Sequence, residues 1–157
     1  MIEESEQIER YRRVGSELEA LLTEELDAVA AMASFASVLH HALPQASWTG
    51  FYRRISTERL QIGPYQGKPG CTEIPFDRGV CGAAAREHRT HLVDDVHAFP
   101  GHIACDVAAK SEIVVPVYDS KGELVAVLDV DSLDLAAFDE VDRAELERLV
   151  RLLTPFL

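Results

Sequence analysis

Three cysteines carry the most reactive side chains of this 157-residue sequence, and their number and spacing limit the chemistry they can support. Cys71, Cys81 and Cys105 all lie in the middle part of the chain. An odd number of cysteines argues against a framework of structural disulfides. The thiols could instead be inert and buried, bind a metal ion, or carry out redox chemistry.

A zinc site is the least favoured of these interpretations. Structural zinc sites usually contain close cysteine pairs such as C-x2-C. The cysteines here are ten and twenty-four residues apart, although His97 or His102 could supply a further ligand. We therefore expect neither a metal ion nor an organic cofactor.

The redox interpretation accounts best for Cys71 and Cys105, which lie beside Gly, Pro and polar residues in predicted loops. Cys81 lies in the segment GVCGAAA, which also fits an inert, tightly packed helix start, so both interpretations stay open for it. In redox chemistry a thiolate becomes a sulfenic acid, and a second thiol converts this to a disulfide that a cellular dithiol reduces. His102 would favour a thiolate at Cys105, whereas Asp106 would oppose it.

Three acidic residues are predicted to gather on one face of the last β-hairpin. Its strands are SEIVVPV (111–117) and ELVAVLDVD (123–131), joined by a short polar turn. The expected register places Glu112 directly opposite Asp129, and Asp131 lies two residues further along on the same face. Apolar residues are expected to share this face: Val114, Pro116, Val125 and Val127.

Opposed like charges destabilise a sheet, so this acidic cluster requires an explanation. The acids could simply be exposed at the edge of the sheet. Alternatively, one carboxyl group could be protonated, or a bound cation could offset the charge. The last two alternatives describe a site that receives a cationic group and uses a carboxyl group of raised pKa as an acid.

The elements that position these residues follow from hydrophobic periodicity. Apolar residues at spacings of three and four predict helices from Glu3 to Leu43, with a break at Gly15. A short helix is predicted at 80–88 and a closing helix from about Asp139. Six strands are predicted, at residues 48–54, 58–63, 72–75, 90–93, 111–117 and 123–131. The expected fold class is α+β, with a central antiparallel sheet of about six strands covered by the N- and C-terminal helices.

Composition and charge exclude several classes of protein. The chain has 47% hydrophobic and 27% charged residues, as in an ordinary globular protein, and its length suits one domain, residues 1–157. A net charge of −12 argues against nucleic acid as a partner. No apolar run approaches the ~20 residues that span a membrane, and the acidic start MIEESEQIER is unlike a signal peptide. We therefore expect a cytoplasmic protein with no membrane partner.

Six segments resemble the free methionine-R-sulfoxide reductases, a family of single GAF-domain enzymes. The segments are WTGFY (48–52), GPYQGKPGC (63–71), DRGVCG (77–82), HAFPGHIACD (97–106), SEIVVPV (111–117) and VLDVDS (127–132). Together they include all three cysteines and all three acids, and the resemblance spans roughly Glu17 to Leu153. It implies a catalytic GAF domain that reduces free methionine-(R)-sulfoxide to methionine.

The resemblance also implies roles for the cysteines. Cys105 would be the nucleophile, Cys71 its resolving partner, and Cys81 a second thiol able to join the relay. The sulfenic acid formed on the nucleophile would become an intramolecular disulfide. Thioredoxin would reduce this disulfide, and the enzyme would be a homodimer.

Five further residues would bind the substrate if the resemblance holds. Glu112, Asp129 and Asp131 would hold its ammonium and sulfoxide groups. Trp48 and Tyr52 would line an apolar wall near the methylsulfinyl group, although Trp48 also fits an ordinary core position. Two other functions stay open: a GAF sensor that binds a small ligand without turnover, and a thiol redox switch without a substrate.

Overall fold

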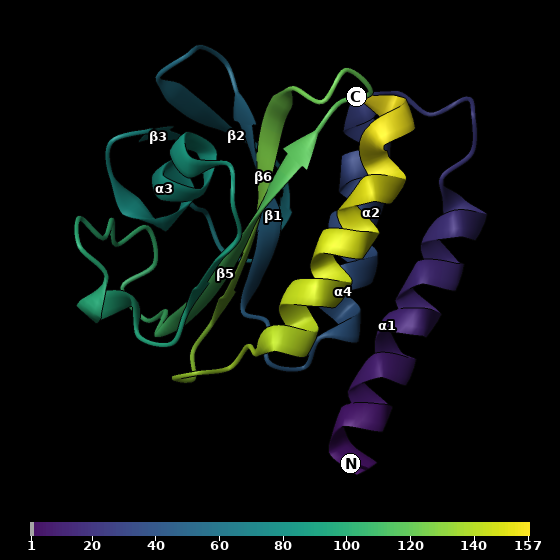
Figure 1. The fold of residues 1–157 in the computed structure, drawn as a ribbon, viewed down its shortest axis with the longest axis horizontal. Helices are drawn as coiled ribbons and strands as arrows, with labels where there is room; N and C mark the ends of the chain where they lie inside the picture. The colour runs from purple at the N-terminus through teal and green to yellow at the C-terminus, as the bar shows by residue number, and fades with distance from the viewer. Residues whose placement is uncertain (1) are drawn as a thin grey trace.

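The sheet at the centre of the fold is built from short runs of β-branched and aromatic residues, as the alternating pattern predicted. The computed structural model describes residues 2–157 and contains six strands in the order β3-β2-β1-β6-β5-β4 (Figure 1). All neighbouring strands are antiparallel, which confirms the predicted α+β fold. The strands are β1 (Trp48–Arg54), β2 (Arg59–Gln66), β3 (Glu73–Pro75), β4 (His91–Val93), β5 (Ser111–Tyr118) and β6 (Leu124–Ser132).

Helices cover both faces of this sheet. In Figure 1, α1 (Ile2–Leu21), α2 (Ala28–Ala42) and α4 (Glu140–Val150) stand on one side, with α1 outermost. The short helix α3 (Gly79–Glu87) lies on the other side, together with the loops that carry Cys71 and Cys105. Within residues 2–157, no helix has both the length and the apolar character that crossing a membrane would require.

The hydrophobic core is divided by the sheet because successive side chains of a strand point to opposite faces. In β1, Phe51 packs with the terminal helices, whereas Tyr52 packs with α3. In β5, Ile113 belongs to the first cluster and Val114 to the second. The functional site described below lies on the α3 face, whereas the terminal helices form the support behind it.

The predicted helix break at Gly15 is wrong, because α1 runs without interruption from Ile2 to Leu21. Gly15 faces α4, where an added Cβ atom would lie 3.5 Å from Leu149 Cδ2. Gly15 is buried against α4 in the interior of α1 and does not end a helix. The chain turns after Leu21, and Asp27 begins α2 by accepting a hydrogen bond from the amide of Ala30 at 2.9 Å.

A buried hydrogen bond fixes α1 to the start of α4. Tyr11 is fully buried, and its hydroxyl donates to Asp142 Oδ1 at 2.6 Å. Asp142 Oδ2 also accepts from the amide of Asp139 at 2.8 Å, which completes the N-terminal capping box of α4. The Asp142 carboxyl group thus accepts one hydrogen bond that caps α4 and another that joins α4 to α1.

We expect Tyr11→Phe to lower the free energy of unfolding by about 1–2 kcal/mol, because it removes the hydroxyl donor from a buried carboxyl group. Urea unfolding followed by circular dichroism measures this change. Ser16→Ala, at an exposed position of the same helix, should change stability by less than about 0.5 kcal/mol. Equal stability of Tyr11→Phe and the wild type would show that the hydrogen bond contributes nothing net.

Candidate active site

The two central strands β5 and β6 bring the three predicted acids to one face of the sheet. Glu112 lies directly opposite Asp131, and Asp129 lies opposite Val114. The predicted pairing of Glu112 with Asp129 is therefore wrong by two positions. A shift of two residues preserves the face, so the predicted grouping of the three acids is retained.

The register differs because the hairpin contains a longer turn and a bulge. Asp119 accepts hydrogen bonds from the amides of Lys121 and Glu123, and its own amide donates to the carbonyl of Glu123. A bulge then inserts Val125 into β6, between its pairings at Leu124 and Ala126. Val125 consequently packs with the helix-side core and not with the acids.

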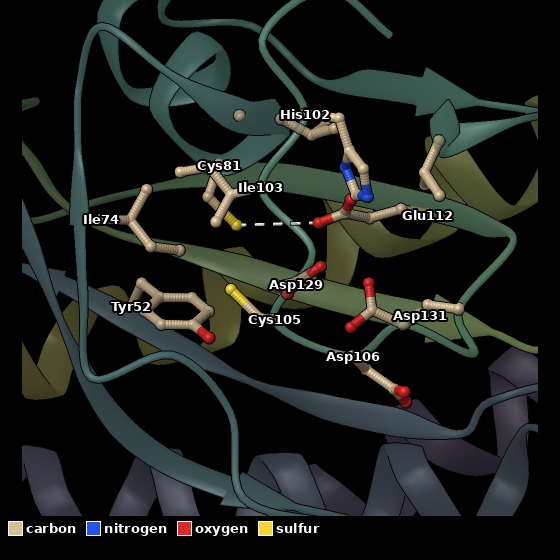
Figure 2. Close-up of a pocket in the computed structure, with 14 residues that line it drawn as sticks. Tyr52, Ile74, Cys81, His102, Ile103, Cys105, Asp106, Glu112, Asp129 and Asp131 are labelled. Atoms are coloured by element: carbon tan, nitrogen blue, oxygen red, sulfur yellow. Dashed lines mark hydrogen bonds between the residues drawn. The ribbon is translucent and has the colours of Figure 1, made fainter. Parts of the chain in front are cut away.

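The acids face a small cavity between the sheet, α3 and the loop that follows β4 (Figure 2). Its volume is about 30 Å³. Two cysteines, an imidazole and a phenol share the cavity wall with four carboxyl groups. The lining residues with polar or reactive side chains are Tyr52, Cys81, His102, Cys105, Asp106, Glu112, Asp129 and Asp131.

A disulfide joins the two loop cysteines beside this cavity. Cys71 and Cys105 are bonded across 34 residues of sequence, with their Cα atoms 5.1 Å apart. The bond links the loop between β2 and β3 to the loop between β4 and β5. Figure 2 shows the Cys105 sulfur between Tyr52 and Asp129. The two cysteines are therefore paired as the resemblance implied, and the order in which they react remains a prediction.

The third cysteine is buried and keeps a free thiol within residues 2–157. Cys81 lies in the first turn of α3, and its Sγ donates a weak hydrogen bond to Glu112 Oε1 at 3.8 Å. Burial raises the pKa of this thiol, and the carboxyl groups of Asp129 and Glu112 raise it further. A thiol in this environment stays protonated and is a poor nucleophile.

Burial opposes ionisation of the carboxyl groups in this arrangement. Glu112 is 8% exposed and Asp129 is 4% exposed, so simple exposure at a sheet edge does not explain the cluster. Burial raises the pKa of all three carboxyl groups, and the neighbouring carboxyl groups raise those of Asp129 and Asp131 further. None of the described residues that line the cavity is Lys or Arg. Protons, or a cation from outside, must therefore balance the cluster.

The two aromatic residues predicted at the site have different positions. Tyr52 lines the cavity, and burial together with the charge of Asp129 raises the pKa of its hydroxyl, which keeps it a hydrogen-bond donor. Trp48 stacks behind it at a ring distance of 5.6 Å and does not contribute to the cavity wall. The Trp48 indole donates to the carbonyl of Lys68 at 2.9 Å and so supports the loop that carries Cys71.

Gly70 permits the close contact between this loop and the aromatic pair. A Cβ atom at Gly70 would lie 3.1 Å from the Tyr52 hydroxyl and 3.2 Å from Trp48 Cζ2. The disulfide loop therefore rests directly on the aromatic wall of the site.

His102 lines the cavity, whereas from the sequence we predicted only an effect on the thiolate of Cys105. Its Nδ1 atom is buried and has no hydrogen-bond partner, and Figure 2 shows the ring directed toward Glu112. Burial lowers the pKa of His102, and His97 lowers it further. The apolar part of the wall, which includes Ile74, Val80 and Ile103, was not predicted as part of the site. No local pattern distinguishes these three residues from ordinary core residues.

This fold and its pocket define a GAF domain, and the chain belongs to the GAF domain family, whose model matches residues 16–157. The free methionine-R-sulfoxide reductase of Saccharomyces cerevisiae is 41% identical over 141 residues, which cover 86% of this chain and 78% of the yeast protein. The enzyme of the same name from Escherichia coli is 39% identical over 142 residues, covering 90% and 85%. Within the GAF family, the chain therefore belongs to the free methionine-R-sulfoxide reductases.

A solved structure supports the same grouping. The X-ray structure of free methionine-R-sulfoxide reductase from Neisseria meningitidis, in complex with its substrate, aligns with a TM-score of 0.87 and 43% sequence identity. The alignment covers 93% of this chain and 87% of the Neisseria chain. The structural alignment and the sequence identities therefore indicate the same family.

The buried carboxyl groups predict an unusual dependence of stability on pH. Their pKa values are higher in the folded protein than in the unfolded chain, so the folded state binds more protons between those two values. Stability should therefore fall as the pH rises from about 4, by up to about 1.4 kcal/mol per pH unit for each proton involved. Asp129→Asn should flatten this fall and unfold at higher urea than the wild type at about pH 8.

Urea unfolding of the disulfide-bonded protein across this pH range measures the effect. Asp77→Asn removes an exposed carboxyl group and should keep the wild-type slope. A parallel slope for Asp129→Asn and the wild type would show that the buried carboxyl group does not control the pH dependence.

Proposed function

We propose that this protein reduces free methionine-(R)-sulfoxide to methionine by cysteine chemistry. The observation that carries the proposal is a cluster of three carboxyl groups, two of them buried, without a basic partner on the cavity wall, beside a Cys71–Cys105 disulfide. Such a site suits a substrate that brings its own positive charge and an oxidised sulfur. The identity to two reductases of that name supports the same reaction.

The ammonium group of a free amino acid would supply the missing positive charge. Asp129 and Asp131 are the best candidates to hold it, because they lie two residues apart on the same face of β6 and both line the cavity. A methionine sulfoxide residue within a protein chain has no ammonium group, so the site would favour the free amino acid. Tyr52 would complete the wall on the side of the sulfur substituents.

The reducing step would use a protonated carboxyl group as the acid. Glu112 lies buried against the cavity and has a raised pKa, so it can hold the proton that the sulfoxide oxygen requires. The Cys105 thiolate would attack the sulfoxide sulfur, and the oxygen would pass to Cys105 as a sulfenic acid. Methionine sulfur gains two electrons and Cys105 loses two, so methionine leaves in its reduced form.

Regeneration would follow through the observed disulfide pair. The thiol of Cys71 would displace water from the Cys105 sulfenic acid and form the Cys71–Cys105 bond. A dithiol reductant, for which we propose thioredoxin, would return both cysteines to thiols by exchange. Cys81 is buried and its pKa is raised, so we place it outside the attacking step and keep only a relay role for it.

The remaining features of the proposal concern the whole molecule. We infer one catalytic domain over residues 1–157 that forms a homodimer and acts in the cytoplasm, where cellular dithiols are available. Nucleic acid does not suit a chain of net charge −12 as a partner.

We expect the reduced wild type to release methionine from the R epimer of free methionine sulfoxide and not from the S epimer. Cys105→Ser should lower this rate by about a thousandfold or more, because the nucleophile is lost. Cys71→Ser should still release about one equivalent of methionine per chain and then stop unless a small thiol is added. Amino-acid analysis measures both results, with dithiothreitol or thioredoxin present for the rates and with pre-reduced protein and no added thiol for the single equivalent.

Two outcomes would contradict the proposal. Absence of methionine from either epimer would favour a sensor that binds without turnover, whose ligand affinity should survive replacement of all three cysteines by serine. Equal rates with free and peptide-bound sulfoxide would contradict the role given to the ammonium group.

A further inference from the structure

A second kind of cation fits the acidic cluster, because a thiol belongs to it. Cys81 Sγ, a Glu112 oxygen and an Asp129 oxygen all lie within 4.8 Å of one another, and all three residues are buried. We propose that these three side chains bind a thiophilic divalent cation, for which Zn²⁺ is the best match. Zinc accepts thiolate and carboxylate ligands together, whereas Mg²⁺ and Ca²⁺ select oxygen ligands alone.

A buried carboxyl oxygen without a hydrogen-bond partner also points to such an occupant. Asp129 is 4% exposed, and its Oδ1 atom is buried with no hydrogen-bond partner. A buried carboxylate oxygen without a partner costs free energy, which a bound cation would offset. Since no Lys or Arg is among the described residues of the cavity wall, the protein itself supplies no permanent positive charge for this role.

The geometry requires only small side-chain movements. With Zn–S and Zn–O distances of about 2.3 Å and 2.0 Å, the sulfur and oxygen ligands of a tetrahedral ion lie about 3.5 Å apart. Cys81 Sγ and Glu112 Oε1 are already 3.8 Å apart. The remaining ligand atoms, within 4.8 Å, must approach by at most about 1.5 Å, which rotamer adjustment of carboxyl groups can supply.

The cavity also has a suitable size in this disulfide-bonded form. Its volume of about 30 Å³ corresponds to roughly one water molecule. An ion coordinated by the three side chains would fill this volume, and Asp131, on the same cavity wall, could supply the fourth ligand.

This site differs from the zinc site considered from the cysteine spacings. Cys71 and Cys105 are joined in a disulfide, so neither can act as a thiolate ligand in this form. Cys81 alone supplies sulfur, and the other ligands are carboxylates from β5 and β6. On binding, the Cys81 thiol releases its proton to solvent and the Zn–S bond forms, without any change in oxidation state.

The cation and the proposed substrate would compete for the same carboxyl groups. This consequence rests on the proposed function, whereas metal binding itself does not. Zn²⁺ should therefore raise the apparent KM for free methionine sulfoxide and leave kcat unchanged. Removing the metal with a chelator should restore the original KM.

The disulfide-bonded protein provides a clean test of binding, because Cys81 is then its one free thiol within residues 2–157. Co²⁺ replaces Zn²⁺ in such sites and gives a thiolate-to-metal absorption band when sulfur is a ligand. We expect one equivalent of Co²⁺ to produce this band in the oxidised wild type, and Zn²⁺ to abolish it by displacement. Cys81→Ser should lose the band, and Asp129→Asn should weaken binding by about tenfold or more.

A matched control removes another group that could capture the ion. His97 pairs with Asp95 at the surface at 3.3 Å, and His97→Gln should leave the band and the affinity unchanged. Circular dichroism establishes whether Cys81→Ser is folded, and Asp129→Asn tests the site if it is not. Absence of Co²⁺ binding to the oxidised wild type, or binding without a thiolate band, would overturn the proposal. A band that persists in both variants would overturn it too.

Discussion

The grouping of three carboxyl groups on the central hairpin, two of them buried, is the constraint on which the rest of this structure depends. Glu112 and Asp129 occupy positions of β5 and β6 where apolar residues would stabilise the fold more. Their cost must be offset by the two apolar clusters on either side of the sheet. The terminal helices contribute one of these clusters. Their packing therefore supplies part of the stability that offsets the free-energy cost of placing the carboxyl groups in the sheet.

The same constraint separates the roles of the three cysteines. Cys81 lies against Glu112 in a buried position, so the carboxyl groups keep its thiol protonated. Cys71 and Cys105 lie in two loops that are rich in Gly and Pro. These loops bring the two sulfur atoms together beside the site. The fold thus places one thiol within the acidic cluster and two where a disulfide can form and be reached by a reductant.

The sequence was sufficient for features that depend on local periodicity. The alternation of side chains along a strand was enough to predict that Asp129 and Asp131 share one face. That prediction is correct even though the predicted register was wrong by two residues. The error itself arose from the Asp119 turn and the bulge at Val125, which side-chain hydrogen bonds and backbone geometry decide. Whether the acids were exposed or buried could not be predicted, because α3 and the loop after β4 cover them from distant parts of the chain. The predicted helix break at Gly15 was wrong for a similar reason, because α1 packs against α4, a helix more than a hundred residues away, and such tertiary packing overrides local helix propensity.

Charge balance also links binding to reactivity in the proposed reaction. Without a cation, the acids oppose any negative charge nearby, and that includes a thiolate at Cys105 on the same cavity wall. An ammonium group bound by Asp129 and Asp131 would offset their charge and so reduce the cost of forming that thiolate. The contact that selects a free amino acid would therefore also activate the nucleophile, and only in the presence of the correct substrate. A metal ion bound by Cys81 and the carboxyl groups would balance the same negative charge but would carry no sulfoxide. The metal ion and the substrate would therefore exclude each other from the site.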